Sequence, residues 1–273
     1  MQLETGIALP KPDRVELSEA SRRLAAGISE RQLPEGVVKH NYSVRPVFTA
    51  EIEASLSRAL SGKPPEVTDA VHFLIARNFV PDGSVADEEE RAALLESGLS
   101  QAKFIADRYL TGDEAAEFLA AMKKIAAYAQ TRTVDPESGQ ARYIELPHKP
   151  VGAPDDYIDL NRMMKKYDPE AYRRLTDILQ NGSGVGFSSL LMEFQRKMAQ
   201  NPEWVREYRA EVHRVNTVLT RTTIDNRFEG ADTSDLASFL QDMNGKFDNT
   251  SFANKDFLTR NLESFSLILR KLV

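Results

Sequence analysis

The chain has 273 residues, of which 41% are hydrophobic and 28% charged, a composition that supports a sizeable core without metals or disulfides. Its formal net charge is −6 and neither half is basic, which argues against a nucleic-acid-binding surface. The absence of cysteine excludes disulfides, thiolate catalysis and cysteine-ligated metal sites.

The first part of the chain is predicted to be an irregular arm followed by a helix. Pro10 and Pro12 prevent early helix formation, so residues 1–16 are expected to be irregular. From about residue 17 apolar residues recur on one side of a helical pattern, until Pro34 stops it.

No segment of the chain predicts a membrane span or a cleaved signal peptide. The N-terminal residues contain no apolar run of signal-peptide length. The longest hydrophobic stretch without charge, about 182–192, falls well short of the ~20 residues that a membrane span needs. We therefore expect a soluble protein without membrane contact, located in the cytoplasm or, as the alternative, exported without a cleaved signal peptide.

Two helices are predicted between residues 49 and 80. Thr49 is a suitable N-cap for the first, and Gly62 closes it. Pro64 and Pro65 open the second, since proline is tolerated in a first helical turn. Its buried face is predicted to consist of Val67, Val71, Leu74 and Ile75.

A pair of long helices is predicted next. The acidic run 87–90 suits the positive end of a helix dipole, and the helix that it begins is expected to run to Leu110. Thr111 and Glu114 then have the spacing of a capping box, which starts a second amphipathic helix. The short connection predicts that the two helices pack as an antiparallel hairpin.

Residues 131–154 interrupt the helical pattern. Two short β-prone pieces flank a Pro/Gly turn between Thr133 and Ile144, which predicts a small β-hairpin. The prolines and the glycine that follow exclude regular structure up to residue 154. This connector, residues 131–154, is predicted either to separate two domains or to be an excursion from a single helical body.

Helical patterns resume after the connector and continue to the end of the chain. The N-cap–proline pairs Asp168-Pro169 and Asn201-Pro202 each start a helix. The last helix has a wide apolar face, which predicts that it docks in the core; the alternative is that it meets a partner. The predicted helices are 155–167, about 168–180, about 187–200, about 201–221, about 231–245 and about 254–272.

The predicted fold is all-α, with roughly ten amphipathic helices in a compact multi-helical body and one small β-hairpin excursion near 133–145. The predicted organisation is an N-terminal arm, two helical halves and a connector between them. The alternative is one continuous domain over 17–273. The arm, first half, connector and second half correspond to 1–16, 17–130, 131–154 and 155–273.

Asp69 and His72 are candidate metal ligands. The two residues stand three apart on one predicted helix, the spacing that di-metal helical bundles use. Such a centre also needs a second copy of the motif and further glutamates. We therefore interpret His72 as a residue at the polar edge of its helix, and we expect neither metal nor cofactor.

Two further patterns resemble functional motifs. The loop with Gly182, Gly184 and Gly186 leads into a helix, where backbone amides could hold an anion. It lacks the preceding strand and the following Gly-Lys that a phosphate loop requires, so a simple turn is the competing interpretation. Ser100 and Lys103 match a serine–lysine motif, but they fall in the middle of a helix and are interpreted as coincidence.

Two classes of function remain open. The first is a non-enzymatic helical interaction or scaffold protein that meets another protein through an amphipathic helix, in one version exported or associated with an appendage or a secretion system. The second is an all-α enzyme or small-ligand-binding protein whose site is assembled from residues far apart in the sequence. The absence of a recognisable nucleophile or acid–base set favours the first class.

Overall fold

The computed structural model describes residues 47–81, 87–154, 156–181, 185–251 and 255–272. Of these residues 71% are helical, in ten α-helices, one π-helix and one short 3-10 turn, and one two-stranded antiparallel sheet is present. The predicted all-α fold with a small β-hairpin is therefore confirmed. The predicted arm and first helix lie outside the described residues.

The first described helices start where local rules predict. Helix α2 spans Ala50–Leu60, and its N-cap Thr49 accepts a hydrogen bond from the Ile52 amide. Helix α3 spans Pro65–Leu74 with proline at its first position. The chain then continues as the π-helix Ile75–Phe79, which the sequence pattern did not predict.

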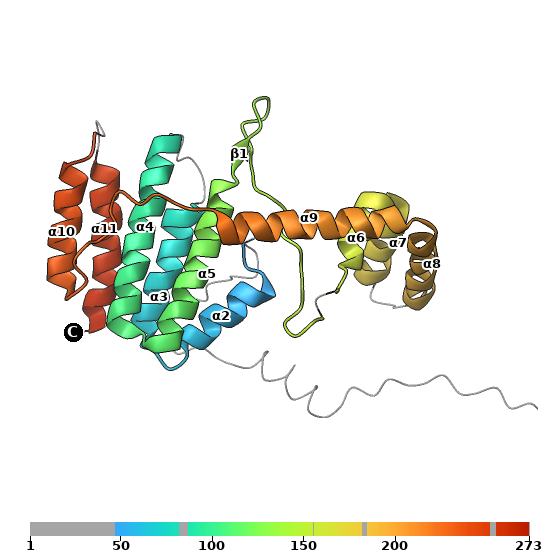
Figure 1. Ribbon diagram of the computed structural model, residues 1–273, viewed down its shortest axis with the longest axis horizontal. Coiled ribbons are helices and arrows are strands. Elements are labelled where there is room, and N and C mark those ends of the chain that lie inside the picture. The colour runs from blue at the N-terminus through green and yellow to red at the C-terminus, as the bar shows by residue number, and fades with distance from the viewer. Residues whose placement is uncertain (1–46, 82–86, 155, 182–184, 252–254, 273) are drawn as a thin grey trace, which may run out of the picture. The chain divides into compact units, whose positions relative to one another are not determined.

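The predicted helical hairpin is present. Helix α4 spans Glu88–Tyr109, α5 spans Gly112–Gln130, and the two pack against each other (Figure 1). The predicted capping box is confirmed: the Thr111 amide lies 3.3 Å from the carboxylate of Glu114. Glu114 also accepts a hydrogen bond from Lys63 at 2.8 Å, so the cap ties α5 to the α2–α3 turn.

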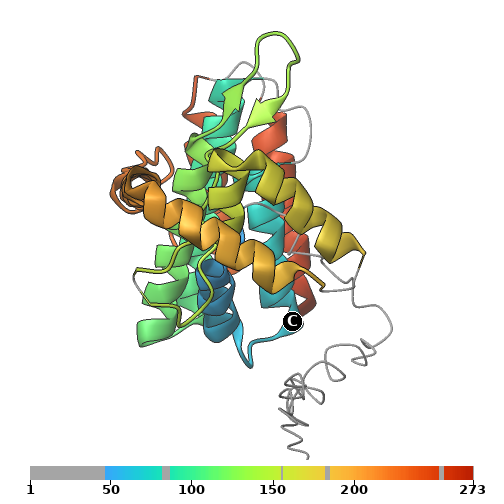
Figure 2. The ribbon, with the colours of Figure 1, turned by 90° about the vertical axis from the view of Figure 1, so that its right-hand side faces the viewer.

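The connector forms the predicted β-hairpin with very short strands. Strand β1 is Thr133–Val134 and β2 is Ala141–Arg142, paired with Thr133 opposite Arg142 (Figure 2). The Asp135 carboxylate accepts hydrogen bonds from the amides of Glu137 and Ser138, which fixes the turn. Those bonds lower the pKa of Asp135.

Four helices follow the connector. Helix α6 spans Leu160–Tyr167, so the predicted start at residue 155 is wrong. The carboxylate of Asp159 accepts from the Arg162 amide at 3.2 Å, and this cap sets the later start. The other helices are α7 (Pro169–Gln180), α8 (Phe187–Gln200) and α9 (Pro202–Arg221).

The last two helices are α10 (Leu236–Asp248) and α11 (Asp256–Leu269), and a short 3-10 turn ends the described chain. The predicted end of α10 at Gly245 is wrong, because the helix continues past it. Phe247 is buried and meets the Phe228 ring edge-on, with centroids 5.0 Å apart. This tertiary contact favours the additional turn.

The buried residues form two hydrophobic cores. The first core draws on α2–α5, α10 and α11, and in it the Phe104 ring stacks on Phe239 with centroids 4.7 Å apart. The second core lies among α6–α9 and includes Met163 and Phe194. Helix α9 contributes to both, since Val215 belongs to the first core and Tyr208 to the second. The division into two helical halves stays a prediction.

A buried polar network joins the π-helix to α4 and α11. The Asn78 side chain donates to the Leu94 carbonyl at 2.9 Å and to Asn261 at 3.1 Å, and Asn261 donates back to Asn78. Gln101 also donates to Asn261. Asn78 lies within the π-helix, so this local winding of the backbone brings its side chain to these partners. No helix among the described residues has the length and apolar character needed to cross a membrane.

Candidate functional site

The predicted anion loop is only partly within the described structure. Gly182 and Gly184 lie outside the described residues, and Gly186 immediately precedes α8. Gly186 has a φ of 86°, a left-handed conformation that favours glycine. A turn is sufficient to explain this glycine, and the anion loop stays a prediction.

Asp69 and His72 lie on α3 as expected. Asp69 is exposed, and half-buried His72 lines a hollow of about 480 Å³ together with Phe48 and Leu60. Among the described residues, no three histidine, aspartate or glutamate side chains gather as a metal-ion site would require. We keep the interpretation of His72 as a residue at the helix edge.

Ser100 is a structural residue. Its buried hydroxyl donates to the Phe228 carbonyl at 2.9 Å and accepts from Asn226 at 3.0 Å. Lys103 pairs instead with Asp107 on its own helix. The two members of the serine–lysine pattern therefore serve separate contacts.

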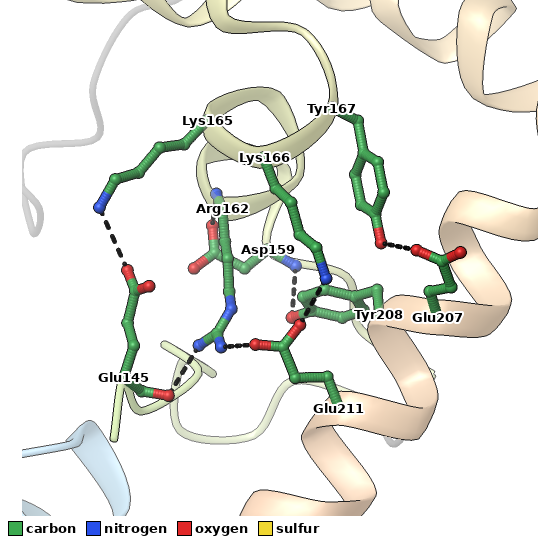
Figure 3. A network of polar contacts seen from close by, with 9 residues as sticks. All are labelled: Glu145, Asp159, Arg162, Lys165, Lys166, Tyr167, Glu207, Tyr208 and Glu211. Atoms are coloured by element: carbon green, nitrogen blue, oxygen red, sulfur yellow. Dashed lines mark hydrogen bonds and ion pairs between the residues drawn. The ribbon is translucent and has the colours of Figure 1, made fainter. Parts of the chain in front are cut away.

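A network of nine residues joins α6, α9 and the end of the connector (Figure 3). Arg162 is at its centre, with a side chain that is only 8% exposed. Its guanidinium donates to the Glu145 carbonyl at 3.0 Å and to the Glu211 carboxylate. Lys166 donates to the second oxygen of Glu211 at 2.9 Å.

The surroundings of Glu211 favour its charged form. Burial alone would raise the pKa of this carboxyl group, but hydrogen bonds from Lys166 and Arg162 outweigh burial, and the pKa lies below its ordinary value. The hydrogen bond to Glu211 likewise raises the pKa of Lys166. Both groups are therefore ionised near neutral pH.

Two tyrosines complete the network. The Asp159 amide donates to the Tyr208 hydroxyl at 3.0 Å, and the Tyr167 hydroxyl donates to Glu207 at 2.9 Å. Burial raises the pKa of both hydroxyls. Since Glu145 also pairs with Lys165, the carboxylates at the centre of the network are held by cations. We interpret the network as a clamp that fixes α6 and the connector on α9.

The clamp predicts an acid-sensitive contribution to stability. Because the pKa of Glu211 is depressed in the folded state, its stabilising effect is complete above the ordinary value of 4.5. The effect is lost as the pH falls through the lower folded value. The free energy of unfolding should therefore differ most between the parent and Glu211→Gln above about pH 4.5.

Trp204 offers a local probe of this effect. It is the single tryptophan of the chain, and its ring stacks on Tyr167 with centroids 5.2 Å apart. Denaturation followed by its fluorescence should show the difference for Glu211→Gln shrinking at low pH. Glu203→Gln is the control, because Glu203 lies on the same helix and has no ion pair within the described structure. A pH-independent difference for Glu211→Gln would contradict the assignment.

Exposed apolar side chains concentrate on the α7–α8 hairpin. Among the described residues it provides four of the eight large apolar side chains that are exposed. Leu179 is 62% and Val185 79% exposed, and Phe187 stands at the start of α8. A Cβ on Gly186 would lie 3.8 Å from Ile178, so the end of the loop packs on the last turn of α7. We call Leu179, Val185 and Phe187 the hairpin tip; Met192 is the fourth residue.

No residue from Ile178 to Met192 is charged, although 28% of the whole chain is. The sequence pattern of 182–192, most of this stretch, indicates only that it is too short for a membrane span. The Arg162–Glu211 pair had no sequence signal, because its members stand 49 residues apart.

The chain was also compared with known proteins. No family model, no curated protein and no solved structure matches it. Proposals about its function therefore start from its own residues and their surroundings.

Proposed function

We propose that the protein is a non-enzymatic helical interaction protein that binds a partner protein through the hairpin tip. The supporting observation is the exposure of three large apolar side chains, Leu179, Val185 and Phe187, at one end of a hairpin. Contiguous exposed apolar surface commonly marks an interaction site, since leaving it in water is unfavourable. The α6–α9 clamp supports this role, since it fixes α6, and α6 packs against α7 of the hairpin.

The chemistry of the tip indicates the kind of partner. Because Ile178 to Met192 contains no charge, a charged group facing this surface would be desolvated without a counter-ion. The partner should therefore present an uncharged, apolar surface of its own. Aromatic and methionine side chains such as Phe187 and Met192 are also enriched in protein interfaces.

We place this function in the cytoplasm, and the alternative is a protein exported without a cleaved signal peptide. The cysteine-free composition is compatible with both. The identity of the partner distinguishes them, because a cytoplasmic partner and a component of an export system belong to different compartments.

Site-specific photo-crosslinking in the producing cells tests the proposal. A photoreactive phenylalanine analogue at position 187 is expected to form an adduct with one partner protein. The same analogue at position 267 is the control, since Leu267 on α11 is 60% exposed but lies outside the tip. The adduct formed from position 187 should disappear when Leu179→Ser and Val185→Ser are added.

Three results would overturn the proposal. They are the absence of any adduct from position 187, the same adducts from positions 187 and 267, and an adduct that survives both serine substitutions. An adduct with the mass of two chains would identify the partner as a second copy. Equal thermal stability of the parent and the serine variant is the required control for folding.

A further inference from the structure

A small cavity in the first core region has an unusual set of charged walls. Its volume is about 170 Å³, and it lies where the start of α4 and the end of α5 meet the segment that follows α9. Arg91 contributes to it from the first turn of α4, and Arg132 contributes from just after the end of α5. The charged lining residues are Glu88, Arg91, Glu96, Arg132 and Asp225.

Arg91 is the least satisfied of these residues. It is 9% exposed, and its one ion pair joins its Nε to Oε2 of Glu88 at 3.5 Å, beyond a good hydrogen bond. That Nε is buried and has no hydrogen-bond acceptor. A guanidinium carries five N–H donors, and the Nε–H of Arg91 is a buried donor that no acceptor within the described structure satisfies.

Arg132 competes for the same carboxylate. Its side chain is 13% exposed and pairs with Oε1 of Glu88, which is itself 67% exposed. Two nearly buried guanidiniums thus share one carboxylate that faces solvent. Removing a cation from water without close pairing is unfavourable, so the weakly paired Arg91 favours a second anion.

The other carboxylates of the cavity do not supply that anion. Glu96 is held by Arg227, whose side chain donates to both of its oxygens at 2.7 and 3.0 Å and whose amide donates at 2.9 Å. Asp225 is exposed at the rim. The guanidinium of Arg227 thus donates to both carboxylate oxygens of Glu96. Arg91 has no carboxylate that accepts two hydrogen bonds in this way within the described structure.

We propose that this cavity binds a small oxyanion, a phosphate or carboxylate group, between Arg91 and Arg132. The planar guanidinium fork matches such oxygens with paired hydrogen bonds. At about 170 Å³ the cavity exceeds the ~30 Å³ of one water molecule several-fold, but it is smaller than the ~300–1,000 Å³ of pockets for larger ligands. It therefore suits one anionic group of a small molecule, with Glu88 moving aside at the mouth. This site is independent of the hairpin tip.

Anion titrations of the purified full-length chain at constant ionic strength test the site. Inorganic phosphate and acetate are the two probes, chloride is the background anion, and binding is followed by calorimetry and by the melting temperature. Saturable binding of at least one probe is expected, with a melting temperature that rises with its concentration by mass action. The two probes distinguish a phosphate site from a carboxylate site.

Three variants make the test specific. Arg91→Met should weaken binding by about tenfold or more, since a hydrogen bond to a charged group contributes about that much. Arg58→Met is the matched control, because Arg58 is 61% exposed and pairs with Glu117 away from the cavity. Glu88→Gln alters an exposed side chain and should tighten binding, since it removes the competing carboxylate.

The outcomes are distinct. Loss of binding in Arg91→Met, retention in Arg58→Met and stronger binding in Glu88→Gln support the site. If Arg91→Met does not fold, the increase in affinity of Glu88→Gln decides alone. The proposal would be overturned if neither probe bound saturably. It would also be overturned if Glu88→Gln left the affinity unchanged while Arg91→Met and Arg58→Met bound the probe equally well.

Discussion

Truncation of the chain after residue 254 is expected to unfold the first core instead of merely removing a surface helix. Four apolar side chains of α11 are at most 1% exposed: Leu258, Leu262, Phe265 and Leu269. Burial of each large apolar side chain contributes about 1.5–3 kcal/mol, so their sum is comparable with the ~5–15 kcal/mol net stability of a typical domain. The truncation also removes Asn261 from its bonds with Asn78 and Gln101.

The competing hypothesis is that α11 is a free amphipathic helix awaiting a partner. Amide hydrogen exchange of residues 257–269 in the isolated full-length protein distinguishes the two hypotheses. A helix docked in the core exchanges slowly, and a free helix exchanges fast. Within α11, Phe265→Ala should cost about 3–5 kcal/mol. Leu267→Ala, at a position 60% exposed, is the control and should cost much less. A truncated chain that melts like the parent would refute the structural role.

Substitution by alanine is expected to have opposite effects on the free energy of unfolding at two helical glycines, Gly98 and Gly245. A Cβ on Gly98 in α4 would lie 2.7 Å from the Cβ of Asn78 and 2.8 Å from the Phe79 ring. The first of these atoms is fixed to the backbone of the π-helix, so the contact cannot be relieved by rotating a flexible side chain. Overpacking of this kind typically costs about 1–3 kcal/mol, so Gly98→Ala should lower the free energy of unfolding by about that amount.

Gly245 in α10 provides the matched control. A Cβ there would meet nothing within 4 Å, and the residue lies inside a helix. Alanine is favoured over glycine in a helix interior by about 0.5–1 kcal/mol, so Gly245→Ala should stabilise the protein. Chemical denaturation of both variants, followed by circular dichroism, measures the two differences. If both substitutions changed the free energy of unfolding in the same direction, the close approach at Gly98 would not explain why a glycine stands there.

The features that the sequence predicted correctly depend on neighbours along the chain. Thr49 caps α2 through an amide three residues away, and Thr111 and Glu114 form their capping box over the same spacing. Proline at the start of α7 acts through its own ring geometry. Such rules are local, and therefore one sequence is enough to apply them.

The features that the sequence did not predict depend on contacts between distant residues. The π-helix places Asn78 against Leu94 and Asn261, a partner 183 residues away. The continuation of α10 past Gly245 depends on the contact of Phe247 with Phe228 in another segment, and no local pattern predicts that contact. Of the two cavity arginines, Arg91 lies on α4 and Arg132 in the connector after α5, and no periodic pattern connects them.

The hydrogen bonds between the π-helix and α11 have a consequence during synthesis of the protein. Asn78 and Asn261 stand 183 residues apart, so the first core cannot be completed until residue 261 has left the ribosome. The residues of the second core, from Ile158 to Val212, are contiguous and can pack while the C-terminal part is still being translated. Until α11 has been synthesised, the apolar surface of α3 and α4 that it contacts remains uncovered, and exposed apolar surface of this kind makes a folding intermediate prone to aggregation.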